Sequence, residues 1–130
     1  MKMHAAAAAA LISLLAGVPA TAMTQARPLP GYRCMMLNLT EPQSMNLSVH
    51  VPVRARPSTA APAVGWAGAV LIVKEPATPV NGFLQVLLPD DRQVWIAANM
   101  VRPYHSLGDP NAQCVPEILS NGRIGFGPGR

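Results

Sequence analysis

The sequence NGFLQVLLPDDRQVWIA, residues 81–97, carries the strongest structural signal in the chain. Asn81-Gly82 is a dipeptide preferred in two-residue hairpin turns. Residues 83–88 have the length and apolar content of a strand, and residues 93–97 repeat them after a turn at residues 89–92, where Pro and Asp are favoured. The stretch therefore predicts two antiparallel strands joined by a tight turn.

Three segments on the N-terminal side extend this pattern. Residues 47–53 alternate Leu and Val with polar residues, as a half-buried strand does, and Pro52 favours an edge position because it cannot donate to a ladder. Residues 63–66 and the apolar run 70–73 also have strand length. About five short strands between residues 47 and 101 predict a mainly β fold, and a small barrel that closes its own edges is the expected architecture.

The composition agrees with short elements. The 130 residues include 14 Pro and 10 Gly, and 50% are apolar. Because Pro interrupts helix interiors and central strands, a long-helix bundle is excluded, and the length allows one small domain. Residues 23–46 and 104–130 show no sustained period. They are predicted to be an extended N-terminal arm and an irregular C-terminal extension on either side of the barrel at residues 47–103.

Residues 1–22 have the pattern of a secretory signal peptide. Lys2 precedes an uncharged apolar run at residues 5–18, and Ala20-Thr21-Ala22 offers small residues for cleavage after Ala22. The apolar run is shorter than a membrane span requires, so no stable membrane insertion is expected after cleavage. A bacterial periplasmic or secreted location is predicted.

The two cysteines are expected to pair, because oxidising compartments favour disulfides. A bridge from Cys34 to Cys114 would enclose most of the patterned sequence, and such a loop stabilises a domain by about 4–5 kcal/mol in the chain-entropy model. The formal net charge is only +4 and no Lys/Arg run is present, so nucleic acid is not an expected partner.

No catalytic or metal-binding set emerges from the residues. His50 and His105 lie far apart in sequence, whereas metal ligands usually include some at short spacings. No Gly-x-Ser-x-Gly elbow is present, and Asp90-Asp91 between two strands is typical of a turn. The chain is therefore predicted to be non-enzymatic, without a metal or cofactor.

A few aromatic and basic residues are candidates for a binding groove. Trp66, beside Gly65 and Gly68, has the sequence context of an exposed ring, whereas Trp95, between Val94 and Ile96, is expected to be core or half core. Aromatic faces and guanidinium donors together suit a peptide or sugar ligand that carries a carboxylate. The candidate ligand-binding residues are Trp66, Phe83, Arg54, Arg92 and Tyr104.

The order of motifs resembles the bacterial SH3-like (SH3b) domain family over residues 51–103. The matching segments are Val51-Pro52-Val53-Arg54-Ala55-Arg56-Pro57-Ser58-Thr59, Val64-Gly65, Asn81-Gly82-Phe83-Leu84-Gln85-Val86 and Val94-Trp95-Ile96-Ala97. The sequence departs from the family where Phe83 replaces a Trp, Val94 replaces a Gly, and Pro52 and Arg56 replace an Asn and a Gly. The resemblance implies an SH3-like barrel that targets or binds rather than catalyses.

From these observations we expect an exported SH3b-like binding module. Its partner would be a cell-wall peptide or peptidoglycan, or an envelope protein. The alternative is an accessory protein, or a small hydrolase or inhibitor, in envelope metabolism. Activity towards wall fragments that depended on His50 or His105 would favour the alternative.

Overall fold

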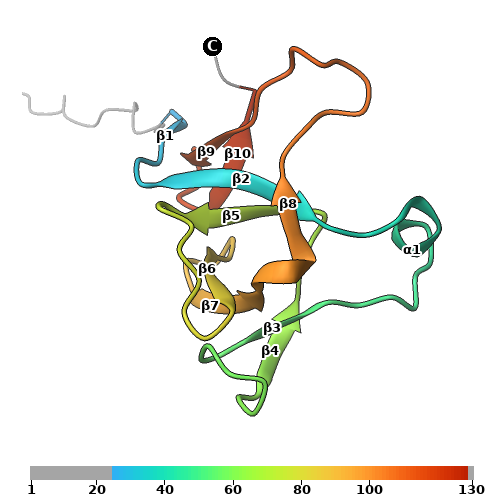
Figure 1. Cartoon of the computed structure of the whole chain (residues 1–130). Helices are drawn as coiled ribbons and strands as arrows, with labels where there is room; N and C mark the ends of the chain where they lie inside the picture. Colours follow the sequence, from blue (N-terminus) through green and yellow to red (C-terminus); the bar gives the residue numbers. More distant parts are fainter. Residues whose placement is uncertain (1–24, 129–130) are drawn as a thin grey trace, which may run out of the picture.

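A computed structural model describes residues 25–128, so the predicted signal peptide at residues 1–22 lies outside the described residues. The described chain is mainly β and forms two antiparallel sheets (Figure 1). The larger has seven strands in the order β4-β3-β7-β6-β5-β2-β8, and the smaller has three in the order β1-β9-β10. Within the described residues, no helix is long and apolar enough to cross a membrane.

The bounds of the strands place the five strands of the predicted meander next to one another in the large sheet, from its edge strand β4 to β5, with β2 and β8 beyond them. Its strands are β2 (Tyr32–Leu37), β3 (Pro52–Arg54), β4 (Ala63–Trp66), β5 (Val70–Lys74), β6 (Phe83–Leu87), β7 (Gln93–Ala97) and β8 (Val101–Pro103). The small sheet consists of β1 (Arg27–Pro28), β9 (Val115–Ile118) and β10 (Ile124–Gly127). A short helix, α1 (Glu41–Ser44), and a 3-10 turn at Ala98–Met100 complete the described elements.

The hairpin turn before β6 is confirmed. Asn81 and Gly82 both have positive φ angles, 52° and 82°, which is the backbone of a type I′ turn. Val80 and Phe83 exchange backbone hydrogen bonds of 2.8 and 2.9 Å across it. The second turn, between β6 and β7, places Asp91 at φ 73°. In that turn the amide of Leu88 donates to the carbonyl oxygen of Arg92 at 2.9 Å.

The predicted closed barrel and the predicted first strand need correction. In the described residues the ladder of the large sheet is open, with β4 and β8 as its edges. The strand expected at residues 47–53 is reduced to β3, and Leu47 is 91% exposed. The Asn46 side chain accepts from the amide of Ser48, and its carbonyl accepts from the amide of Val49. Local turn formation at Asn46 therefore overrides the alternating pattern.

The segments expected to be irregular also contain strands. β2 belongs to the predicted arm, yet it pairs with β5 on one side and β8 on the other. Cys34 and Met35 are both buried although they are neighbours. A strand covered on both faces shows no alternation, which explains why the sequence gives no strand signal here. The predicted C-terminal extension contributes β9 and β10.

Apolar side chains form a core on each face of the large sheet. One face carries the larger cluster, which includes the fully buried Val53, Val73 and Ile96. On the other face Ile72 and Leu87, which are opposite each other in the ladder, pack against Ile124 of the small sheet. The large sheet therefore lies between its main core and the three-stranded sheet.

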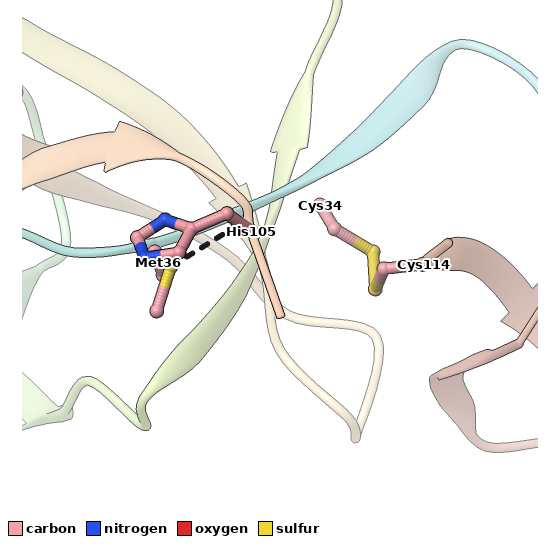
Figure 2. The surroundings of a disulfide bond; sticks show 4 residues. All are labelled: Cys34, Met36, His105 and Cys114. Carbon is pink, nitrogen blue, oxygen red and sulfur yellow. Dashed lines mark hydrogen bonds between the residues drawn. A yellow bond between two sulfur atoms is a disulfide. The ribbon is translucent and has the colours of Figure 1, made fainter. Parts of the chain in front are cut away.

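The disulfide between Cys34 and Cys114 is confirmed, with an S–S distance of 2.02 Å and a Cα–Cα distance of 6.0 Å (Figure 2). It joins β2 to the residue that precedes β9. Close to it, the backbone amide of His105 donates to the Met36 sulfur at 3.4 Å. The bridge therefore attaches the small sheet covalently to the large one.

Candidate functional site

Trp66 is the exposed aromatic residue around which the candidate site is built. It ends β4, an edge strand, and is 60% exposed. The imidazole of His50 stacks on its indole with ring centroids 5.0 Å apart and an interplanar angle of 23°. The stack holds one face of the indole and leaves a large apolar side chain at the surface, which is the usual character of a recognition residue.

A groove of about 230 Å³ adjoins Trp66. We call it the Trp66 groove. Its floor consists of Ile72, Leu87 and Ile124, each at most 6% exposed, and Phe126 of β10, 49% exposed, forms a second aromatic wall. The residues that line the groove are all uncharged, and they are Trp66, Gly68, Val70, Leu71, Ile72, Val86, Leu87, Leu88, Pro89, Ile124, Gly125 and Phe126.

The groove depends on contact between elements that are distant in sequence. The amide of Ile124 donates to the carbonyl of Pro89 at 3.0 Å, which fixes β10 against the turn that follows β6. Phe126 is not among the predicted binding residues, because the sequence of residues 104–130 predicts an irregular extension. The signal present was the alternation of Ile124 and Phe126 with two glycines.

The other predicted binding residues do not line this groove. Phe83 is 6% exposed and belongs to the interior, so its ring offers no surface to a ligand. Nη1 of Arg54 donates to the carbonyl of Ala61 at 2.9 Å and thereby closes the loop after β3. These two side chains have structural contacts in this fold.

Arg92 lies in the turn between β6 and β7. Its Nε donates to Asp90 Oδ2 at 2.8 Å, with both side chains about half exposed. This side-chain hydrogen bond lowers the pKa of Asp90 from its ordinary value. Asp90 Oδ1 also accepts from the backbone amide of Arg92 at 3.2 Å. This local hydrogen bond agrees with the predicted role of Asp90 as a turn residue.

Tyr104 lies beside the disulfide and does not line the Trp66 groove. It lines a cavity of about 420 Å³ together with Arg33, Gln113 and both cysteines. The five predicted residues are therefore dispersed over several parts of the fold, and Trp66 alone of the five lines the groove. Among residues 25–128, no group of three or more His, Cys, Asp or Glu side chains is arranged to hold a metal ion.

Comparison of the chain with protein-family models, with curated proteins and with solved structures gave no match.

Proposed function

We propose that this chain is an exported, non-enzymatic binding module of the SH3b type, and that its ligand is an apolar peptide segment of an envelope partner bound in the Trp66 groove. The observation that carries the proposal is the pair of exposed aromatic walls, Trp66 and Phe126, above a floor of buried aliphatic side chains. Grooves of this construction recognise ligands by burying their apolar side chains.

The lack of charge in the groove bears on the class of ligand. A charged cell-wall peptide would lose hydration on entering an apolar groove without gaining an ion pair. An apolar segment of a partner protein has no such cost. We therefore favour the envelope-protein form of the proposal over the peptidoglycan form.

Two further observations support the module type and the compartment. Residues 52–97 hold β3 to β7 in the order in which the SH3b-like motifs occur, including the Asn81-Gly82 turn. The pattern of residues 1–22 and the Cys34–Cys114 bridge are both consistent with export, because disulfides persist in oxidising compartments.

Site-specific photo-crosslinking in the producing cell tests the proposal. In the test variants a photoreactive phenylalanine analogue replaces Trp66 or Phe126. In the matched control it replaces Val80, which is 46% exposed and lies outside the groove. We expect a discrete adduct with one envelope protein from both groove positions and none from position 80. Equal adducts from all three positions, or none from the groove, would refute the proposal.

Two further measurements separate the alternatives. Co-sedimentation with purified cell-wall sacculi that is lost on Trp66→Ala would support the peptidoglycan form instead. Hydrolysis of wall fragments that is lost on His50→Ala or His105→Ala would identify an enzyme and overturn the non-enzymatic reading.

A further inference from the structure

A second groove, of about 310 Å³, lies between β2, β8 and the loop that contains α1. We call it the Arg102 groove. It shares no lining residue with the Trp66 groove. Its apolar lining is aliphatic or thioether in character and comes from Met36, Leu37, Leu39, Val49, Ala69 and Leu107.

Arg102 is the charged residue of this lining. Its Nε is buried and has no hydrogen-bond partner, and within residues 25–128 no carboxylate forms an ion pair with it. A buried donor without a partner is rare in folded proteins, because it has lost its water without a replacement. An acceptor that arrives with a ligand would supply the missing partner once the Arg102 side chain turns Nε towards the groove, because Nε is not accessible to solvent here.

The two amide side chains of the lining also favour an acceptor. Gln43 Oε1 accepts from the amide of Thr40 at 2.8 Å, and Asn46 Oδ1 accepts from the amide of Ser48 at 2.9 Å. Each amide keeps both hydrogens of its NH2 group and one oxygen lone pair, so each side chain has more donors than acceptors left for the groove. Three of the four polar side chains in the lining thus present donors, and the fourth, Ser44, uses its hydroxyl hydrogen on the Glu41 carbonyl.

We propose that the Arg102 groove binds an aliphatic monocarboxylate, such as a medium-chain fatty acid, with its carboxylate on the Arg102 guanidinium. Such a ligand brings acceptors at one end and only apolar surface elsewhere. A peptide would also bring backbone N–H donors, for which the polar side chains of the lining offer fewer acceptors than donors, namely Ser44 Oγ and one lone pair on each amide oxygen. The volume is at the lower end of the range for small-molecule sites, about 300–1,000 Å³.

The exposed side chains around the mouth agree with an apolar ligand. Leu107 is 88% exposed, and Met45 and Leu47, in the loop whose neighbouring residues line the groove, are 77% and 91% exposed. Large apolar side chains so fully exposed can fold over an aliphatic chain as it enters. The proposal is independent of the Trp66 groove and its partner.

Calorimetric titration of the purified protein with decanoate and with decanol tests the charge contribution. We expect decanoate to bind about tenfold to a hundredfold more tightly than decanol, the ratio that one charge-assisted hydrogen-bonded contact provides. Arg102→Gln should remove this preference, whereas Trp66→Ala should leave it unchanged. Equal binding of the two compounds, or an unchanged preference in Arg102→Gln, would overturn the proposal.

A second variant guards against misfolding of Arg102→Gln. Because Leu107 is almost fully exposed, Leu107→Asp should fold normally, and its negative charge near the mouth should weaken decanoate more than decanol. Competition with a leucine-rich hexapeptide that has a free C-terminal carboxylate distinguishes the ligand class. If the peptide displaced decanoate at a concentration below that of decanoate itself, the proposal would be contradicted. Sedimentation that showed the protein to self-associate, with decanoate binding lost in the associated form, would also contradict it.

Discussion

The Cys34–Cys114 bridge should contribute about 4 kcal/mol to the free energy of unfolding. The cysteines are 80 residues apart, and closing a loop of this length removes about 4.5 kcal/mol of chain entropy from the unfolded state. Native proteins of this size are stable by about 5–15 kcal/mol in total. Replacing both cysteines by Ala should therefore remove a large share of the stability.

Urea denaturation of the parent protein and of the Cys34→Ala/Cys114→Ala variant measures this loss. The parent should lose nearly the same free energy when it is reduced with a thiol, whereas the variant should not respond to the thiol. That pair of results assigns the effect to the bridge rather than to the altered side chains, of which Cys34 is buried.

Amide hydrogen exchange gives the local part of the prediction. The bridge attaches the small sheet to β2. The variant should therefore show a larger loss of amide protection in β9 and β10 than in β6 and β7. A loss of less than about 1 kcal/mol would refute the loop-closure argument. A uniform loss of protection in both sheets would refute the local part, because the bridge would then act on global unfolding alone.

Gly82→Ala should destabilise by about 1–2 kcal/mol in urea denaturation, because nothing crowds a Cβ there but φ is +82°; an unchanged midpoint would contradict the assigned turn. Ile96→Ala, at a fully buried position, should cost about 2–5 kcal/mol, whereas Leu107→Ala at the surface should change stability by less than about 0.5 kcal/mol. NMR titration should place the pKa of Asp90 below its ordinary value, and Arg92→Ala should raise it. The lowered pKa means that this contact stabilises above the unfolded-state pKa and is lost as pH falls through the folded one.

Local signals in the sequence were sufficient to predict the β6–β7 hairpin and the turn that precedes it. Asn81 and Gly82 both tolerate the positive φ that a two-residue hairpin turn requires, and the apolar residues on either side of the next turn form β6 and β7. The context of Trp66 between glycines indicated an exposed ring, and the structure places it so.

Long-range contacts were not predictable in the same way. β2 has no alternation because Met35 packs in the main core while its neighbour Cys34 is buried and bridged to Cys114. Residues 124–127 of β10 belong to the extension predicted to be irregular, yet a Cβ at Gly125 would lie 2.7 Å from a methyl group of Leu119. The glycine there makes room for a packed neighbour, which no local pattern reveals.

The candidate binding residues likewise depend on long-range contacts that the sequence does not reveal. Arg54 was predicted to bind a ligand from its type alone, but its use depends on the Ala61 carbonyl, which the fold brings within 2.9 Å. Phe126 becomes a wall only because a backbone hydrogen bond holds β10 beside Pro89. The chemical type of a side chain can be read from the sequence, whereas the atoms that it contacts in the folded protein depend on the tertiary structure.

The position of β2 between β5 and β8 also sets an order of assembly. β6 and β7 are joined by a short turn and can pair early, whereas β2 must wait for two strands that are synthesised much later, and such non-local pairing is slow. Until residues 101–103 arrive, one side of β2 is an unpaired apolar edge, which is a template for pairing between chains. Aggregation during folding should therefore begin at Met36 and Leu37, and a holding chaperone that protects the chain would be expected to cover this strand.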